Sequence, residues 1–306
     1  MTSPEPTAFE ATVVIVGYNG AEFLGPCLES LLAMDMTPSR YEAIYIDNAS
    51  SDKSVEVVER FHASFPNLRI VRNKYNLGFP AAANQGAGLS RAPILVLLNQ
   101  DTVVERSWLR ELLWPFEDHP EIAAVGSRVI NGDGPRLYSA ALEVLYGGIC
   151  IVHEGDRRTD AVSGCAMAVR VDVLRRVGGF AADLFMYGED LDLGHRLRAA
   201  GHQIAYAPAS VAHHQAIRAS RASTRTYMFY SARNRVLVCV RNYRRKRSYL
   251  VADIFALFPL TAFAELVRSR RRKDAIGWLL EARVESLRGA LASIRTRRGP
   301  LETSAP

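Results

Sequence analysis

Short apolar runs and amphipathic stretches alternate along the first hundred residues of the chain. Each run is four to six residues long and ends at polar residues, which is typical of a strand buried in a sheet. Each amphipathic stretch places apolar residues at helical spacing. The strands are expected at 11–16, 43–46, 68–71 and 94–98, and the helices at 23–32, 55–65 and 81–89. This alternation predicts an α/β fold with a doubly wound, mostly parallel sheet.

Polar residues follow directly after the expected strands. The fourth apolar run leads into Asn99, Gln100 and Asp101. Ligands of an open α/β sheet bind beyond the carboxyl ends of its strands, so Asp101 is a candidate for binding a cation or a polar substrate. Asp47 follows the second run and can accept hydrogen bonds from a ribose hydroxyl or a base N–H. Both acids have an ordinary alternative, as turn and helix-capping residues.

The turn after the first strand, Gly17-Tyr18-Asn19-Gly20, argues against two classes of nucleotide-binding enzyme. It contains no GxGxxG sequence, which disfavours a dinucleotide-dependent dehydrogenase. It also lacks the glycine-rich phosphate loop followed by a basic residue that a sugar nucleotidyltransferase is expected to carry there.

The second half of the chain places several acids at the start of one expected helix. Residues 161–169 suggest a strand with a tight turn of small residues, and 173–177 a short helix. Glu189, Asp190 and Asp192 then open a helix that runs to about residue 200. Three acids in a first turn have a simple explanation, because each complements the helix dipole. By the same effect, the helix N-terminus is expected to lower the pKa of Asp190.

Composition and charge narrow the class of protein. The chain has 306 residues, and its four cysteines are widely spaced without a CxxC pair, which favours a reducing compartment. The net charge of +6 is concentrated in residues 241–306, which hold 15 Lys and Arg against 6 Asp and Glu. Residues 1–240 are therefore slightly acidic, and this argues against nucleic acid as a partner.

The basic tail contains an uncharged segment, residues 254–264, between two clusters of arginine and lysine. Its 11 residues are well short of the roughly 20 that span a bilayer. An apolar segment between basic clusters suits the surface of an anionic membrane. The alternative is a helical extension that packs on the body of the protein or on a dimer partner.

Five motifs, in order along the chain, resemble those of family 2 glycosyltransferases, and most of all the branch that includes rhamnosyltransferases. The resemblance covers roughly residues 11–245. The motifs are Val14-Ile15-Val16-Gly17-Tyr18-Asn19, Asp47-Asn48-Ala49-Ser50-Ser51-Asp52, Arg72-Asn73-Lys74-Tyr75-Asn76-Leu77-Gly78-Phe79, Leu98-Asn99-Gln100-Asp101-Thr102 and Tyr187-Gly188-Glu189-Asp190.

The resemblance implies a GT-A fold that binds a nucleotide diphosphate sugar across the carboxyl ends of the sheet, with Mg²⁺ or Mn²⁺ bridging the diphosphate. The ligands implied for the metal are Asp101 and one or both of His213 and His214. Asn99 stands where the family often has a second aspartate, so the metal site has one charge fewer. The residues implied for donor binding are Tyr18, Asn19, Asp47, Asn48, Asn76, Gly78, Asn84, Asn99 and Asp101.

The resemblance further implies that Asp190 is the general base of an inverting single displacement and that Glu189 binds acceptor or donor hydroxyls. Asp192 is expected to face solvent or to serve the structure. The favoured donor is dTDP-rhamnose, followed by UDP-sugars, and the expected acceptor is a cell-envelope glycan or a lipid-linked glycan. A sugar nucleotidyltransferase and a non-catalytic, membrane-associated nucleotide-sugar binder are the alternatives.

The expected organisation has four parts. A disordered leader (1–10) precedes a half that binds the nucleotide sugar (11–130) and a half that carries the acceptor and the catalytic acid (131–240). A basic helical tail (241–306) follows. The expected location is the cytoplasm, with peripheral attachment to the inner face of the cytoplasmic membrane.

Overall fold

The computed structural model describes residues 9–132, 134, 136–145, 148–154, 159–215, 225–242, 249, 253, 259–260, 263 and 272–295. The chain forms two compact units. Unit 1 consists of Met1–Val144 and Cys150–Arg218, and unit 2 of Leu145–Ile149 and Ala219–Pro306. Most of the expected leader and most of the apolar segment 254–264 lie outside the described residues.

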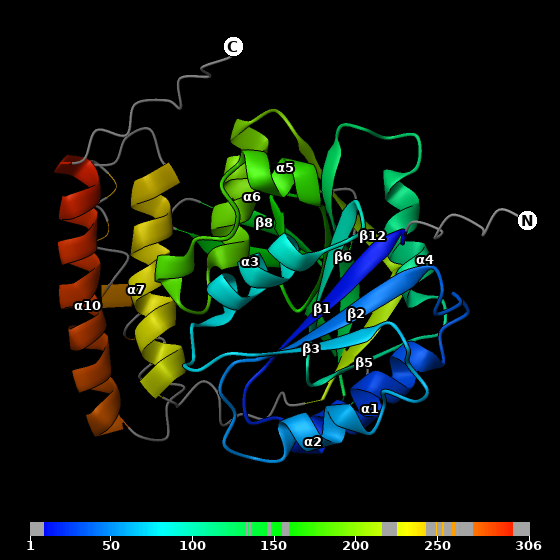
Figure 1. Cartoon of the computed structure of the whole chain (residues 1–306). Coiled ribbons are helices and arrows are strands. Elements are labelled where there is room, and N and C mark those ends of the chain that lie inside the picture. The colour runs from blue at the N-terminus through cyan, green and yellow to red at the C-terminus, as the bar shows by residue number, and fades with distance from the viewer. Residues whose placement is uncertain are drawn as a thin grey trace, which may run out of the picture. The chain divides into compact units, whose positions relative to one another are not determined.

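The first half of unit 1 contains the parallel strands that the apolar runs predict (Figure 1). Neighbouring strands pair in parallel in the order β3-β2-β1-β4. The predicted helix at 55–65 ends earlier, at Glu59, and Pro66 disfavours helical backbone at Phe65. The elements are β1 (Ala11–Gly17), α1 (Ala21–Leu32), β2 (Tyr41–Asp47), α2 (Ser54–Glu59), β3 (Leu68–Arg72), α3 (Phe79–Leu89) and β4 (Ile94–Asn99).

The second half of unit 1 extends the sheet in the order β4-β11-β6-β12-β5, with β7 paired to β6. Strand β11 is antiparallel to both of its neighbours, β4 and β6. A small sheet has the order β10-β8-β9. The elements are β5 (Thr102–Val104), α4 (Trp108–Leu113), β6 (Ile122–Asn131), β7 (Leu137–Ser139), β8 (Ala141–Leu145), β9 (Ile149–His153), β10 (Ala161–Val162), β11 (Ala166–Arg170), α5 (Val171–Arg176), α6 (Glu189–Ala199) and β12 (Gln203–His214).

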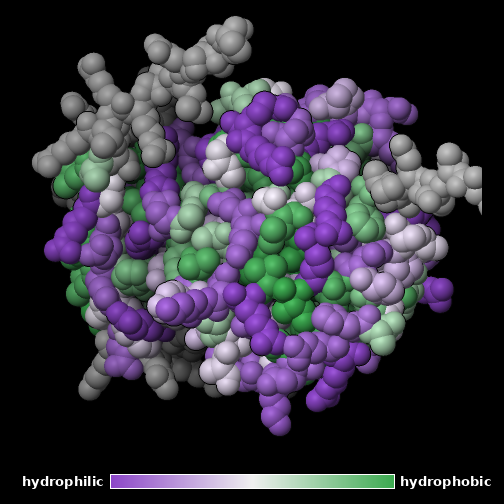
Figure 2. Space-filling view, in the orientation of Figure 1, coloured by the Kyte–Doolittle hydropathy of each residue, from purple (hydrophilic) through white to green (hydrophobic). Residues whose placement is uncertain are grey.

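Helices cover both faces of the large sheet, as a doubly wound fold requires (Figure 1). Successive side chains of a strand point to opposite faces. In β1, Val13 therefore packs in the core with residues of α1 and α4, and Val14 in the core with residues of α3, α5 and α6. In the orientation of Figure 1 much of the surface is hydrophilic, and a hydrophobic area lies near the place where β1, β2 and α3 are drawn (Figure 2).

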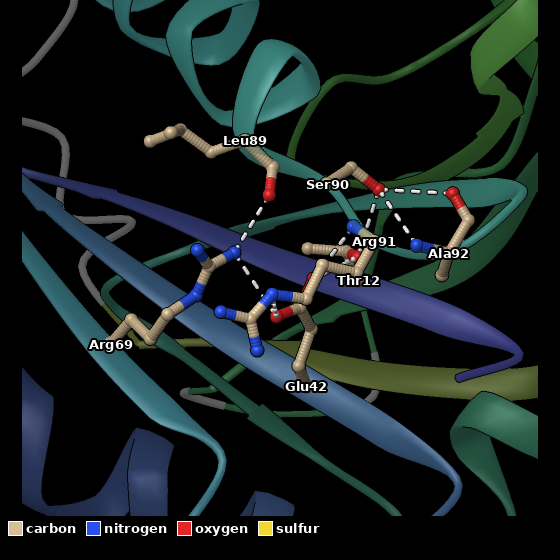
Figure 3. Close-up of polar contacts among 7 residues, drawn as sticks. All are labelled: Thr12, Glu42, Arg69, Leu89, Ser90, Arg91 and Ala92. Atoms are coloured by element: carbon tan, nitrogen blue, oxygen red, sulfur yellow. Dashed lines mark hydrogen bonds and ion pairs between the residues drawn. The ribbon is translucent and has the colours of Figure 1, made fainter. Parts of the chain in front are cut away.

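A buried carboxylate, Glu42, anchors the amino ends of the parallel strands (Figure 3). Its Oε1 accepts hydrogen bonds from the Thr12 hydroxyl and the Arg91 backbone N–H, both at 2.8 Å. Its Oε2 lies 3.0 Å from Nη2 of Arg69, and that guanidinium also donates to the carbonyl of Leu89 at 2.7 Å. These contacts hold the segment between α3 and β4 against β1 and β2.

In unit 2, helices α7 (Arg225–Asn242) and α10 (Arg272–Arg295) pack against each other. Asp253 is fully buried and forms ion pairs with Arg235 of α7 and Arg283 of α10. The expected helical extension is therefore present in the described part of the tail. Among the described residues, no helix combines the length and the apolar character that crossing a bilayer requires.

Candidate functional site

The carboxyl ends of β1, β2 and β4 bring three of the sequence motifs together. In the sheet register, Gly17 lies beside Asp47, and Val16 lies beside both Ile46 and Asn99. The turn after β1, the loop after β2 and the segment after β4 therefore start at one level of the same sheet edge. This edge is where an open α/β sheet binds its ligand.

Asp101 and His214 form a buried pair at this edge. Strand β12 runs antiparallel to β5, which places His214 opposite Thr102. The Nε2 of His214 lies 3.3 Å from Oδ1 of Asp101 and 3.3 Å from Nδ2 of Asn99. His214 is fully buried, and the ring of Tyr138 on β7 stacks on it with centroids 4.8 Å apart. Tyr138 was not expected at the site, because its place depends on the pairing of β7 with β6.

His213 lies on the other side of strand β12. Its Nε2 is 3.2 Å from a carboxylate oxygen of Glu105 at the surface. Adjacent residues of a strand face opposite ways, so only one histidine of the doublet can lie beside Asp101. The sequence predicted a histidine at the site without choosing between the two, and the structure brings His214 to Asp101.

Asn48 holds the loop before α3 in place. This buried side chain donates through Nδ2 to Oδ1 of Asn76 at 2.9 Å, and its Oδ1 accepts from the backbone N–H of Leu77 at 3.0 Å. Gly78 follows with φ at +80°, and a Cβ there would lie 2.4 Å from the carbonyl oxygen of Phe185. Three predicted donor-binding residues, Asn48, Asn76 and Gly78, are thus linked to one another and to the loop before α6.

Asn19 and Asn84 make structural contacts with their side chains. Oδ1 of Asn19 accepts from the Ser51 backbone N–H at 2.8 Å, which joins the turn after β1 to the loop after β2. Asn84 on α3 donates to the carbonyl of Phe180 and accepts from the N–H of the same residue, both at 2.8 Å. Both residues therefore shape the loops around the site through their amides.

Asp47 and Tyr18 differ in their exposure at this edge. Asp47 is buried, and its Oδ2 accepts from the backbone N–H of Ser50 at 3.2 Å. The Tyr45 hydroxyl lies 3.4 Å from the other carboxylate oxygen of Asp47. The side chain of Tyr18 is about half exposed. A buried acceptor and an exposed aromatic side chain therefore lie at the ends of adjacent strands.

The second acidic group lies at the start of α6. Three residues of the preceding loop, Phe185, Tyr187 and Gly188, have φ between +65° and +87°. Left-handed backbone is costly for residues other than glycine, and it occurs where the surrounding structure holds it in place. Helix α6 begins directly after these residues. Glu189 is 7% exposed, and its Oε2 has no hydrogen-bond partner in the described part of the chain, whereas Asp190 is partly buried.

Burial dominates the protonation of this acid pair. It raises the pKa of Glu189 to about 8, and the adjacent charge of Asp190 adds to the effect. Burial also raises the pKa of Asp190, although the backbone N–H groups of Leu191 and Gly164 donate to it at 2.8 and 3.4 Å. The expectation that the helix N-terminus lowers the pKa of Asp190 is therefore wrong, because desolvation outweighs those hydrogen bonds. Asp192 is buried and pairs with Arg196, so it serves the structure.

The turn Ser163-Gly164-Cys165 connects the two acidic regions. The Asn99 backbone N–H donates to the carbonyl of Cys165 at 2.9 Å, and the thiol of Cys165 lies 3.6 Å from the hydroxyl of Thr102. Gly164, which precedes Cys165, donates its backbone N–H to Oδ2 of Asp190. The acid pair is thereby held at the same end of the sheet as Asp101.

The donor set at Asp101 fits a divalent cation that also binds a substrate. No group of three or more His, Cys, Asp or Glu side chains with metal-binding geometry occurs within the described ranges. Asp101 and His214 offer one carboxylate and one imidazole. Mg²⁺ is commonly held by one or two carboxylates together with substrate phosphates, and imidazole suits transition metals. The two side chains therefore supply one oxygen and one nitrogen ligand, and the other ligands of a cation held here would come from a substrate and water.

A family model for glycosyl transferase family 2 matches residues 12–178. The chain belongs to this family. The match includes the carboxyl ends of β1, β2 and β4 and the turn at 163–165, and it ends before Glu189 and Asp190.

Relatives of this family 2 member include two proteins named as glycosyltransferases. The glycosyltransferase AglE of Haloferax volcanii is 27% identical over 219 residues, which cover 68% of this chain and 66% of that protein. An N-acetylglucosaminyl-diphospho-decaprenol L-rhamnosyltransferase of Mycobacterium tuberculosis is 29% identical over 229 residues, which cover 63% of this chain and 73% of the relative.

Solved structures share the fold. The mannosyltransferase PcManGT of Pyrobaculum calidifontis, in complex with GDP-Man and Mn²⁺, superposes with a TM-score of 0.62 at 18% identity. The match covers 93% of this chain and 89% of that one. The predicted GT-A fold with a C-terminal helical extension is confirmed.

Proposed function

We propose that this protein is an inverting glycosyltransferase that uses a nucleotide diphosphate sugar. The observation that carries the proposal is the placement of two acidic centres, Asp101 with His214 and Glu189 with Asp190, on either side of one turn. The first suits the cation and diphosphate of a donor, and the second suits the hydroxyl of an acceptor. Membership of family 2 supports the same reaction.

In the proposed reaction, Asp190 accepts the proton of the acceptor hydroxyl. The hydroxyl oxygen forms a bond to the anomeric carbon from the face opposite the nucleotide, and the bond from that carbon to the diphosphate breaks. The nucleoside diphosphate leaves with the electron pair of that bond. Because the attack comes from the opposite face, the anomeric centre is inverted. Burial raises the pKa of both acids, and two backbone N–H groups favour the ionised form of Asp190. In the proposed division of roles Asp190 is the ionised member of the pair, and Glu189, with a pKa of about 8, is the protonated member at neutral pH. Glu189 can therefore donate a hydrogen bond to a sugar hydroxyl.

A cation bound at Asp101 would be Mg²⁺ or Mn²⁺, and it would neutralise the charge that develops on the leaving diphosphate. Asp101 and His214 would hold it. Asn99 adds no charge, and its amide lies 3.3 Å from the His214 ring, so it orients that ring. Asp47 and Tyr18 are proposed to receive the nucleoside at the neighbouring strand ends.

For the donor we propose dTDP-rhamnose ahead of UDP-sugars, and for the acceptor a lipid-linked or cell-envelope glycan. The rhamnosyltransferase relative, whose name describes a decaprenol-linked acceptor, supports this choice. We also propose that the protein is cytoplasmic and that its tail contacts an anionic membrane. Four exposed apolar residues of α10 support this contact, because their spacing places them along one side of the helix. They are Ile276, Leu280, Val284 and Leu291.

Purified protein incubated with nucleotide sugars and Mg²⁺ or Mn²⁺ tests the reaction by nucleotide release, and thermal shift tests donor binding. Asp190→Asn should lower turnover by at least about 100-fold, which is the usual contribution of a general base, with donor affinity nearly unchanged. Asp101→Asn should weaken cation-dependent donor binding. Asp172→Asn, at a surface ion pair on α5, is the control. Unchanged turnover in Asp190→Asn would refute the assignment of the base, whereas donor binding without any nucleotide release by the wild type would favour a non-catalytic binder.

Co-sedimentation with vesicles tests the membrane contact. Binding is expected for vesicles that contain anionic lipid, and the double variant Leu280→Glu/Val284→Glu should reduce it by at least tenfold, because it replaces exposed apolar area with charge. Equal binding to neutral and anionic vesicles, or to none, would contradict this part of the proposal.

A further inference from the structure

Gln100 lies between Asn99 and Asp101, and its side chain forms hydrogen bonds with the backbone of Tyr18, just after β1. Its Oε1 accepts a hydrogen bond from the N–H of Tyr18 at 3.2 Å, and its Nε2 donates to the carbonyl of Tyr18 at 3.1 Å. A side-chain amide can accept and donate at the same time, whereas a carboxylate only accepts and an apolar side chain does neither. The two contacts thus select an amide of this length.

Gly20 provides the space for this contact. A Cβ at Gly20 would lie 2.2 Å from both Cδ and Oε1 of Gln100, so any larger residue must displace the amide. The backbone of Gly20 has φ of −125°, which other residues adopt readily. Glycine is therefore needed here for the close approach of Gln100 and not for its own conformation.

The contacts of Gln100 add a side-chain link between two segments of the site that follow the paired strands β1 and β4. Hydrogen bonds from Asn19 and from the start of α1 tie the turn after β1 to the loop at residues 50–54. Those of Gln100 tie Tyr18 to the segment that carries Asn99 and Asp101. Tyr18 is about half exposed, so its own side chain does little to fix its position.

We propose that Gln100 is a positioning residue that holds Tyr18 at a fixed place relative to Asp101. This inference rests on the proposed function, in which one nucleotide diphosphate reaches both Tyr18 and Asp101. A donor then meets a preformed site, and the protein does not have to order the turn after β1 when the donor binds. Loss of the contact is expected to weaken nucleotide binding while the fold is retained.

Two variants remove the contact by different routes. Gln100→Met keeps the length of the side chain and loses both hydrogen bonds, and Gly20→Ala displaces the amide by occupying its space. Gly25→Ala on α1 is the matched control, because a Cβ there would meet nothing within 4 Å apart from its own neighbours and helix backbone. UDP, GDP and dTDP are titrated calorimetrically into each protein with Mn²⁺. Both test variants should bind the preferred nucleotide about tenfold more weakly than wild type and the control, which corresponds to about 1.4 kcal/mol.

Combined variants separate positioning from a general structural role. If Gln100 acts through Tyr18, Gln100→Met should weaken binding less than about twofold further in a Tyr18→Ala background, and Gly20→Ala with Gln100→Met should match either single variant. Wild-type affinity in Gln100→Met, or effects that multiply in the Tyr18→Ala background, would overturn the positioning role. A wild-type protein that binds none of the nucleotides would instead refute the proposed function itself.

Discussion

Glu189→Gln should stabilise the free protein, and by an amount that grows with pH. The pKa of Glu189 is raised from its ordinary value of 4.5 to about 8, mainly by burial. Between these two values the folded protein keeps a proton that the unfolded chain releases. The unfolded state thus binds fewer protons, and the free energy of unfolding of the wild type falls as pH rises. Glutamine does not ionise, so it removes this dependence.

The size of the effect follows from the shift. One pH unit corresponds to about 1.4 kcal/mol per proton, so holding Glu189 neutral costs about 3 kcal/mol at pH 7 and less than about 1 kcal/mol at pH 5. A domain of this size gains roughly 2–4 °C per kcal/mol, so the variant should melt about 6–12 °C above wild type at pH 7. The charge of Asp190 contributes to the shift, so part of the gain comes from relieving that repulsion.

The assay is urea unfolding of wild type and variant from pH 5 to pH 8, followed by tryptophan fluorescence. Trp108 is fully buried in unit 1 and reports on its unfolding. Glu59→Gln, at an exposed ion pair with Arg72, should change stability by less than about 1 kcal/mol at every pH. A difference between Glu189→Gln and wild type that does not vary with pH would refute the argument from burial.

Three further predictions follow from the contacts. Glu42→Ala should cost about 3 kcal/mol of unfolding free energy, because it leaves a guanidinium without its buried carboxylate, whereas Glu59→Ala should cost less than about 1 kcal/mol; equal urea midpoints would contradict this. His214→Ala should weaken Mn²⁺-dependent nucleotide binding by about tenfold and His213→Ala should not, and calorimetry showing the reverse would move the site to the surface histidine. Asn84→Asp should lower the free energy of unfolding by about 1–3 kcal/mol, since a carboxylate cannot donate to the carbonyl oxygen of Phe180. An unchanged urea midpoint would show that this hydrogen bond does not stabilise the fold.

The sequence predicted the strand ends at which Asp47 and Asp101 lie, because the signals for these strands are local. A buried parallel strand needs a continuous apolar run, and the polar residue that follows it must lie at the sheet edge. Asp47 and Asp101 could be placed in this way without knowledge of distant contacts. The position of Glu189 and Asp190 at a helix start could also be predicted, because the acids themselves favour that position.

The remaining details of the site depend on tertiary contacts. The choice of His214 over His213 follows from the register of β12 against β5, which no local pattern specifies. An amide that binds a ligand and an amide that binds the backbone look alike in a sequence, so Asn84 was predicted only as a donor-binding residue. The sign of the pKa shift at Asp190 was predicted wrongly, because the depth of burial outweighs the helix terminus.

The turn at 163–165 has a consequence for recombining this enzyme with its relatives. Strand β11, which follows the turn, lies far from β4 in sequence but pairs with it residue by residue. A chimaera with its crossover at residue 130 would take β4 from one parent and the turn with β11 from the other. The pairing of β4 with β11 and the hydrogen bond from Asn99 to Cys165 would then join residues of different parents. A crossover between α5 and α6 keeps β4, the turn and β11 from one parent and exchanges the acid pair with everything after it. The match to the family model ends at residue 178, between those two helices.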